Sequence, residues 1–236
     1  MKNLILAPAN KDALIHEWLD KKEDRTFDLW VTYYDDDYND EGEKFLKGYA
    51  DKVFVKKGFK YPSAHGVITD FPEIFDYEYV WMPDDDILLN THQINRMFEI
   101  FKEYDLWLGM PGIERGPGSH NTFMTQARQP ANLLRYIGFI EVQCPLFSSY
   151  ALKKCWNTFN ESQSGWGIDI VWPALLKRPL NKIAVIDEIG AKHTRPVGGG
   201  DLYKRLNVDP DGEMQAMKKK YNVKIDGNTY GVIPKQ

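Results

Sequence analysis

The chain has 236 residues, 43% of them hydrophobic, and a formal net charge of −4 at pH 7. This composition predicts a compact protein with a sizeable core, and the slight negative charge argues against nucleic acid as a partner. The apolar runs are too short for a signal-peptide core or a transmembrane segment. Only two cysteines occur, Cys144 and Cys155, without metal-binding spacing, so we expect free thiols and a cytoplasmic protein.

The first 110 residues alternate between strand-like and helix-like segments. We expect strands at 3–7, 27–34, 52–56, 77–82 and 106–110, and helices at 13–19, 63–75 and 91–104. Ser63 and Thr91 are the expected N-caps of the second and third helices, and Pro72 limits the second. Such alternation predicts an α/β fold with a mostly parallel sheet flanked by helices.

The second half is less regular. Residues 112–130, rich in glycine and proline, predict a long surface loop. We then expect strands at 139–147 and 182–186 and helices at 149–159, 168–176 and 210–221, the last capped by Asp209. Residues 195–201 include three consecutive glycines and predict a mobile segment. Because no linker divides the chain, we expect a single domain over 1–236.

Three consecutive carboxylates, Asp84, Asp85 and Asp86, follow the apolar segment 79–82. A bound cation is the simplest relief for their mutual repulsion at the end of a buried strand. Side chains two residues apart on an extended segment face the same way, so Asp84 and Asp86 are expected to point into one site. Hard oxygen ligands favour Mg²⁺ or Mn²⁺. The alternative is a solvated acidic turn.

Three motifs together resemble those of a known family. Met82-Pro83-Asp84-Asp85-Asp86-Ile87 resembles the Asp-x-Asp metal motif of GT-A glycosyltransferases, Gly165-Trp166-Gly167-Ile168-Asp169 is similar to their Gly-Trp-Gly-acid segment, and His193 resembles a late histidine that completes the metal shell in some of them. The stretch 192–200 also resembles a poorly characterised family of plant and bacterial proteins assigned to this fold. The resemblance covers most of the chain in order. It implies a GT-A-like, Rossmann-like fold with a nucleotide-binding half, 1–110, and an irregular acceptor-side half, 111–236, that completes the metal site.

The resemblance also implies roles for individual residues. Asp84, Asp86 and His193 would bind Mn²⁺ or Mg²⁺, and Asp84 would also contact the nucleotide. A metal ion there acts as a Lewis acid on the departing diphosphate. The alternative for His193 is an ordinary hydrogen-bonded histidine near the surface. Asp85 would face away from the metal or orient its two neighbours.

Asp169 is the candidate general base, which takes the proton of an attacking acceptor hydroxyl. In that role it implies inversion at the anomeric carbon, although the sequence leaves a retaining route open. The alternative is that Asp169 only caps or charges the first turn of its helix. Trp166 and Gly167 are expected to contact the sugar, because glycine lets a ligand approach the backbone and tryptophan offers an apolar face. Gln143 is expected to contact the acceptor.

Nucleotide recognition is expected from the loops that follow the first strands. The candidates are Pro8, Asn10, Tyr33, Asp36, Lys60 and Arg195. Tyr33 would stack on the base, an acid such as Asp36 would bind the ribose, and Arg195 would meet phosphate oxygens. The alternative for each of these residues is ordinary solvation of a polar side chain.

The sequence therefore predicts a metal-dependent glycosyltransferase that moves a sugar from a nucleotide-sugar, by family analogy a UDP-sugar, to a hydroxyl acceptor such as a carbohydrate. A nucleotidyltransferase has a similar sheet and acidic site, but Ala7-Pro8-Ala9-Asn10 stands where its Gly-rich basic signature would follow the first strand. A carbohydrate- or nucleotide-binding protein without turnover is the remaining alternative.

Overall fold

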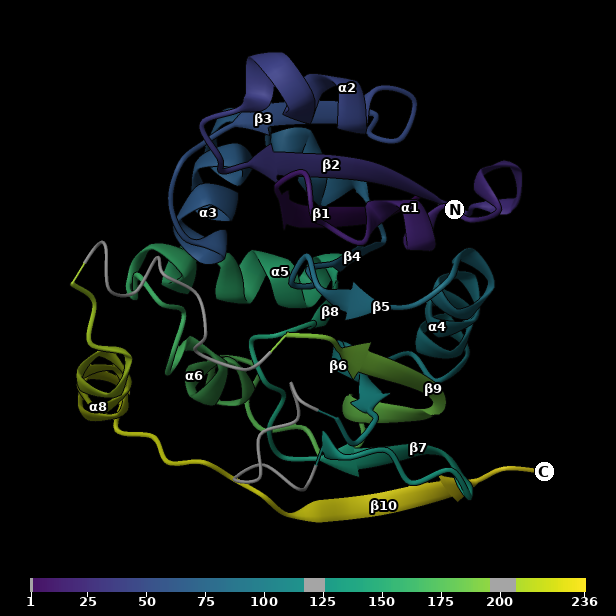
Figure 1. The fold of residues 1–236 in the computed structure, drawn as a ribbon. Coiled ribbons are helices and arrows are strands. Elements are labelled where there is room, and N and C mark those ends of the chain that lie inside the picture. The colour runs from purple at the N-terminus through teal and green to yellow at the C-terminus, as the bar shows by residue number, and fades with distance from the viewer. Residues whose placement is uncertain (1, 117–125, 196–206) are drawn as a thin grey trace.

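The computed structural model describes residues 2–116, 126–195 and 207–236, which form a ten-stranded sheet with helices on both faces (Figure 1). Nine strands follow the order β10-β7-β9-β6-β8-β4-β1-β2-β3, and β5 pairs with β9. The strands are β1 (Asn3–Ala9), β2 (Phe27–Tyr33), β3 (Lys52–Val55), β4 (Tyr79–Trp81), β5 (Ile87–Leu88), β6 (Leu108–Ile113), β7 (Asn132–Ile137), β8 (Leu146–Ser148), β9 (Ile183–His193) and β10 (Thr229–Pro234).

The helices alternate with strands in the first half and cluster after β8 in the second. They are α1 (Ile15–Trp18), α2 (Glu43–Leu46), α3 (Lys60–Asp70), α4 (Thr91–Glu103), α5 (Ser149–Cys155), α6 (Ile168–Leu175) and α8 (Pro210–Tyr221). Short 3-10 turns occupy Lys22–Asp24, Pro72–Asp76 and Trp156–Asn160, and a π turn occupies Tyr38–Gly42. No helix among these described segments is long and apolar enough to cross a membrane.

The sheet is mixed, and its longest run of parallel strands lies in the first half. Strands β3, β2, β1 and β4 are parallel neighbours, as the alternation of elements predicts. Beyond β4 only the β6–β9 pair is parallel, and β8, β7 and β10 run antiparallel to their neighbours. The carboxyl ends of the parallel strands therefore form one rim, at which the acidic triplet lies.

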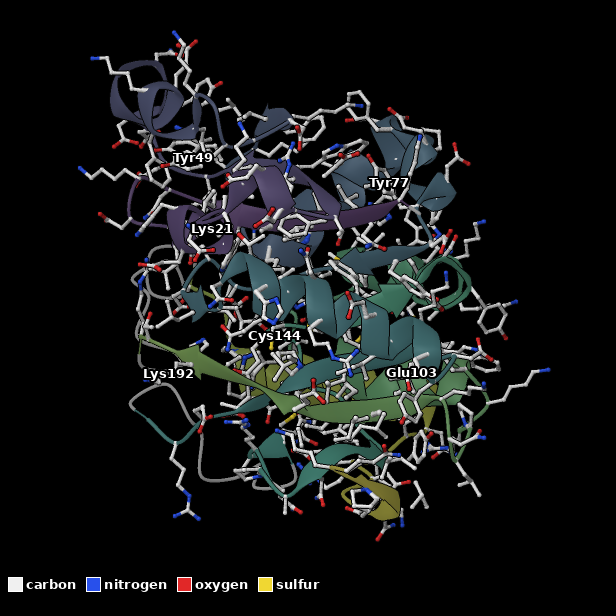
Figure 2. All side chains as sticks on the ribbon, turned by 90° about the vertical axis from the view of Figure 1, so that its right-hand side faces the viewer. Lys21, Tyr49, Tyr77, Glu103, Cys144 and Lys192 are labelled. Carbon is white, nitrogen blue, oxygen red and sulfur yellow. The ribbon has the colours of Figure 1, made fainter. Side chains whose placement is uncertain are left out.

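Aromatic side chains on alternate faces of the central strands build the two halves of the core. Trp81 of β4 packs on Trp18 of α1, with ring centroids 5.7 Å apart. Phe147 of β8 packs on Trp172 of α6 at 5.0 Å. Figure 1 shows α4 on one side of the sheet and α3, α5 and α6 on the other. Cys144 is a free, buried thiol near the middle of the molecule, as Figure 2 shows.

One predicted N-cap and one predicted helix start were wrong by one to three residues. Helix α4 does begin at Thr91, but Asn90 is its N-cap: the Asn90 side chain accepts from the N–H of Gln93, and the Gln93 side chain accepts from the N–H of Asn90. Helix α3 begins at Lys60, three residues before the predicted cap Ser63, which lies inside the helix. The earlier start carries Lys60 into the functional site.

The second half departs most from the sequence prediction. The strand expected at 139–147 is wrong: β7 ends at Ile137, β8 begins at Leu146, and the residues between them belong to neither strand. Strand β9 continues to His193, seven residues past its expected end at 186. Strand β10 was not predicted. Helix α8 and its Asp209 cap are confirmed. Parts of the loop predicted at 112–130 and of the mobile segment predicted at 195–201 lie outside the described residues.

Candidate functional site

The acidic triplet is held beside the end of β9 by a very short strand. Strand β5 directly follows Asp86, and its Ile87 pairs with His193 in antiparallel register. Thr194 donates two hydrogen bonds of 3.0 Å to the carbonyl oxygen of Asp86, one from its backbone N–H and one from its hydroxyl. Lys192, at the outer end of β9, is labelled in Figure 2. Two segments 108 residues apart in the sequence thereby meet at one point.

Asp84, Asp86 and His193 form a single cluster in which one ligand atom from each lies within 4.8 Å of the others. Nε2 of His193 is 3.4 Å from Oδ1 of Asp86 and 3.7 Å from Oδ2 of Asp84. Nδ1 of the same ring lies 2.8 Å from the carbonyl oxygen of Arg195, a contact that fixes the ring with Nε2 toward the carboxylates. Two carboxylates and an imidazole are a donor set that suits Mn²⁺ or Mg²⁺.

The cluster has unbalanced electrostatics. Burial raises the pKa of Asp86, an effect that His193 opposes and Asp84 reinforces. Burial alone would lower the pKa of His193, but its hydrogen bond to Asp84 and the charges of both carboxylates raise it on balance. Positive charge at this point is therefore favourable, and a proton on His193 and a divalent cation compete to supply it.

Lys60 joins the cluster to a second segment of the chain. Its ammonium lies 2.5 Å from Oδ1 of Asp84. The same nitrogen donates to the carbonyl oxygens of Val142, Gln143 and Met82 at 2.6, 3.1 and 3.3 Å. Although burial would raise the pKa of Asp84, Lys60 and His193 together hold it below its usual value. Lys60 thus lies in the site as predicted, with its donors already engaged by the protein.

Asp85 links the triplet to two other residues. Its carboxylate accepts a hydrogen bond of 2.8 Å from the hydroxyl of Tyr34 and lies 3.2 Å from the guanidinium of Arg195. Arg195 also donates to the carbonyl oxygen of Asp12 at 3.0 Å. Burial raises the pKa of Asp85 to about 6, against the lowering effect of Arg195. The Asp85 side chain therefore contacts Tyr34 and Arg195 and not its two acidic neighbours.

Asp169 is a buried carboxylate at the start of α6. It accepts backbone hydrogen bonds from Ile170, at 2.9 Å, and from Val142 and Gly167. Burial outweighs these bonds and raises the pKa of Asp169 to about 7. A carboxylate poised near neutral pH, and held by fixed N–H donors, has the properties of a general base.

The metal cluster and Asp169 belong to the same site. Burial raises the pKa of the Tyr61 hydroxyl, and the charges of Asp84 and Asp169 both raise it further. Tyr61 also donates a 2.6 Å hydrogen bond to the carbonyl oxygen of Val142, whose N–H is bound to Asp169. The backbone of Val142 therefore links the predicted base to Tyr61 and Lys60. Its N–H donates to Asp169, and its carbonyl oxygen accepts from the other two side chains.

The glycines of the Gly-Trp-Gly segment have a structural reason that the sequence did not indicate. Gly165 and Gly167 have φ of 82° and 91°, the left-handed region that favours glycine. A Cβ on Gly165 would lie 2.6 Å from the Tyr61 ring, and one on Gly167 would lie 2.9 Å from Met214 of α8. The position that each Cβ would take is thus filled by protein, and Gly167 serves as N-cap of α6; the sugar contact expected of Gly167 stays a prediction. Trp166 is half-buried in the same segment.

Glu213 of α8 holds that segment and was missed by the sequence analysis. Its carboxylate accepts from the N–H groups of Gln163 and Ser164 at 2.9 and 2.8 Å, and from the hydroxyls of Ser162 and Ser164 at 3.1 and 2.6 Å. Although burial would raise the pKa of Glu213, these hydrogen bonds lower it on balance. In the sequence Glu213 is one of several charged residues of a predicted helix, and no pattern distinguishes it from the others.

Glu141 is the second functional candidate that was missed. It lies in the irregular segment between β7 and β8, where the sequence had predicted a regular strand. Burial raises the pKa of Glu141 to about 8, and the charge of Asp169 contributes. Gln143, predicted to contact the acceptor, donates a short hydrogen bond from its Nε2 to this carboxylate. Besides the acidic triplet, the site therefore contains two further carboxyls, the buried Asp169 and the half-buried Glu141.

The predicted nucleotide contacts are placed unevenly. Tyr33 is fully buried, and its hydroxyl donates to Asp37 at 2.6 Å, so its ring is not open to a base in this structure. Asp36 is exposed and pairs with Lys57. Pro8 and Asn10 are half-buried at the end of β1, near the rim. Tyr34, one residue after the predicted Tyr33, is the aromatic residue that reaches the acidic triplet.

Comparisons with known proteins bear on the fold. No family model matches the chain, and no curated protein matches its sequence. Solved structures of the S. aureus glycosyltransferase TarS do resemble it. One has a TM-score of 0.57 at 16% identity and covers 94% of this chain and 44% of its own. A structure of TarS 1–349 in complex with UDP-GlcNAc has a TM-score of 0.57 at 14% identity, covering 93% of this chain and 71% of its own.

A third structure, TarS 1–349 in complex with UDP, has a TM-score of 0.56 at 15% identity and covers 92% of this chain and 70% of its own. The chain thus spans less than half the length of the longer TarS structure. At these identities the likeness concerns the fold. The fold is the GT-A-like α/β fold that the sequence motifs predicted.

Proposed function

We propose that this protein is a metal-dependent glycosyltransferase that uses a nucleotide-sugar donor, with UDP as the nucleotide. The observation that carries the proposal is the cluster of Asp84, Asp86 and His193 on the carboxyl rim of a GT-A-like sheet. Ligands of open α/β sheets bind at that rim. The UDP and UDP-GlcNAc complexes of the similar TarS structures support the choice of nucleotide. The acceptor is a hydroxyl compound, for which a carbohydrate is the leading candidate.

The proposed mechanism assigns separate tasks to the two parts of the site. Asp84, Asp86 and His193 would hold a divalent cation, which would supply positive charge to the departing diphosphate oxygen. Arg195, beside Asp85, has a half-exposed guanidinium that can bind a donor phosphate oxygen. Lys60 neutralises Asp84 and keeps the triplet in place through its carbonyl contacts.

Asp169 takes the proton of the acceptor hydroxyl as that oxygen attacks the anomeric carbon. A carboxyl with a pKa of about 7 is half ionised at neutral pH, and so a large fraction of it is ready to accept a proton. Attack from the side opposite the diphosphate inverts the configuration at the anomeric carbon, and inversion is therefore our proposal. The likeness of 192–200 to plant and bacterial proteins of this fold, and a cytoplasmic location, stay predictions.

The proposal is tested by thermal unfolding with UDP, with and without Mn²⁺. A ligand at a hundred times its Kd stabilises the folded state by about 2.7 kcal/mol. We expect that gain only when both UDP and Mn²⁺ are present, and we expect Asp86→Asn to abolish it. Asp70→Asn, which changes an exposed carboxylate at the end of α3, is the matched control and should keep the full gain.

Stabilisation by UDP that needs no metal, or that survives Asp86→Asn, would contradict the proposal. A binding protein without turnover is separated by Asp169→Asn. In a transferase this variant keeps its affinity for UDP and Mn²⁺ but loses the release of UDP from a UDP-sugar. A protein without turnover releases no UDP in either form.

A further inference from the structure

The backbone at Glu141 belongs to no strand, but hydrogen bonds hold it in place. The side chain of Gln126 accepts from the N–H of Glu141 at 3.1 Å and donates to the carbonyl oxygen of Phe139 at 3.2 Å. Gln126 is almost fully buried. The next residue, Val142, is held by its N–H, which donates to Asp169, and by its carbonyl oxygen, which accepts from Lys60 and Tyr61. The Glu141 side chain therefore starts from a fixed point.

The carboxyl of Glu141 lies between the two working parts of the site. The N–H of Val142 donates to Asp169, and the carbonyl oxygen of Gln143 accepts a 2.7 Å hydrogen bond from the N–H of Asp84, so the segment that carries Glu141 is held by both groups. One comes from the predicted base and the other from the metal cluster. In a transfer reaction the sugar that moves lies between the metal-bound diphosphate and the acceptor hydroxyl at the base. A residue between these two parts would lie beside that sugar.

Gln143 gives an independent sign of a missing partner. Its Nε2 donates to Glu141, but its Oε1 is buried and accepts no hydrogen bond within the described part of the chain. A buried carbonyl oxygen without a donor costs stability, and such atoms are few in folded proteins. A ligand hydroxyl would supply the donor once the Gln143 side chain turns this oxygen toward the site. The Glu141 carboxyl can accept from a second hydroxyl and, when protonated, donate to a ring or hydroxyl oxygen.

We propose that Glu141 and Gln143 form a hydroxyl-binding pair that orients the sugar of the donor between the metal cluster and Asp169. The inference rests on the proposed function, since it requires a nucleotide-sugar at the rim. It goes beyond that function because it assigns selectivity for the sugar to a segment distinct from the metal motif and from the Gly-Trp-Gly segment. In this arrangement the nucleotide is bound by the rim, and the pair distinguishes a UDP-sugar from UDP alone.

The test compares the affinities for UDP and for UDP-sugars by calorimetry in the presence of Mn²⁺. The probes are UDP, UDP-GlcNAc, UDP-glucose and UDP-galactose, and the quantity followed is the Kd for UDP divided by the Kd for the UDP-sugar that binds tightest. The variants are Glu141→Ala, Glu141→Gln and Gln143→Leu. Glu188→Gln is the matched control, because it changes a half-buried glutamate of β9 that pairs with Arg96 of α4. Thermal unfolding of each variant checks that it is folded.

We expect Glu141→Ala to lower that ratio at least about tenfold, the equivalent of one strong hydrogen bond, while the Kd for UDP stays within about twofold. Glu141→Gln should keep part of the ratio, and Gln143→Leu should lower it severalfold. A ratio unchanged in all three variants overturns the inference and leaves the proposed function standing. Equal losses for UDP and UDP-sugars also overturn it, because the pair would then only support the fold. A wild-type protein that binds neither UDP nor any UDP-sugar refutes the proposed function and the inference together.

Discussion

Asp187 in β9 and Asp86 beside the end of β9 are both buried carboxylates, but the protein compensates them in different ways. Asp187 is fully buried and receives two hydrogen bonds from Arg135, at 2.6 and 3.0 Å, and a third of 2.9 Å from the N–H of Gln129. Within the described residues Asp86 forms an ion pair with the His193 ring alone, at 3.4 Å, with the charge of Arg195 acting from further away, and burial raises its pKa.

The difference separates a structural carboxylate from one that awaits a ligand. A buried charge is tolerated when hydrogen bonds and an opposite charge replace its water. Asp187 has both from residues of its own chain. Asp86 does not, and it repels Asp84 besides. The charge of Asp187 is therefore compensated by its own chain, whereas the charge of Asp86, at nearly the same burial, is compensated only in part.

The same substitution at both positions gives the largest expected contrast. Asp187→Asn leaves the buried guanidinium of Arg135 without its counter-charge, so we expect a loss of about 3–5 kcal/mol in the free energy of unfolding. Asp86→Asn, measured without metal, removes a repelled charge and should leave that free energy unchanged or slightly higher. Urea unfolding of the two variants beside wild type measures both. A large loss at position 86 without metal would undo the comparison.

Asp169 extends the contrast to the dependence of stability on pH. Its pKa is about 7 in the folded protein and about 3.9 in an unfolded chain. The folded state therefore keeps a proton that the unfolded state releases, and the free energy of unfolding falls as pH rises from about 4 to about 7, by roughly 1.4 kcal/mol per unit.

Asp169→Asn lacks this titration. The free energy of unfolding of the variant minus that of wild type should therefore increase with pH. Near pH 8 this difference should be roughly 4 kcal/mol larger than at pH 4. Urea unfolding of both proteins at pH 4.5, 6 and 8 measures the gap. A gap that stays constant across this range would show that the Asp169 carboxyl titrates normally.

The smallest predicted effect concerns metal affinity. The carboxylates raise the pKa of His193 above its usual value of about 6.5, in spite of burial. Since the metal needs the neutral imidazole, the affinity for Mn²⁺ should weaken by up to about tenfold for each pH unit below that pKa. Calorimetric titration with Mn²⁺ at pH 6, 7 and 8 tests this. His193→Gln should bind Mn²⁺ more weakly and with a flatter pH profile, whereas an equal slope in both proteins would assign the proton to another group.

The sequence predicted the metal cluster well because its signal is local. Asp84 and Asp86 follow an apolar strand, and their spacing of two residues puts both on one side. This pattern can be recognised without knowing how the rest of the chain folds. His193 was found only through a family resemblance, since no local pattern shows that β5 pairs with β9. The parallel half of the sheet was likewise predictable from alternating strands and helices.

The missed residues depend on tertiary contacts. Glu141 lies in a stretch whose apolar pattern predicts a strand, and only the three-dimensional contacts of Gln126, Lys60 and Tyr61 hold it in an irregular path. Glu213 acts across the gap between α8 and the segment 162–166. Glycine at 165 and 167 has a further reason that only the tertiary structure shows, because a Cβ at these positions would meet Tyr61 and Met214.

Strand β9 contains an irregularity whose effect is felt at its far end. Pairing with β6 passes from Pro111–Ile186 to Gly112–Gly190, so that β9 uses four residues where β6 uses one. The three surplus residues include Asp187, bound by Arg135, and the carbonyl oxygens of 187 and 188 accept from Arg128 at 2.9 and 3.1 Å. Bulges of this kind change the direction of a strand and the face that each later side chain occupies. The parity of that insert thus decides whether His193 faces the aspartates, and lineages that lengthen or shorten it by a single residue should lose the histidine as a ligand.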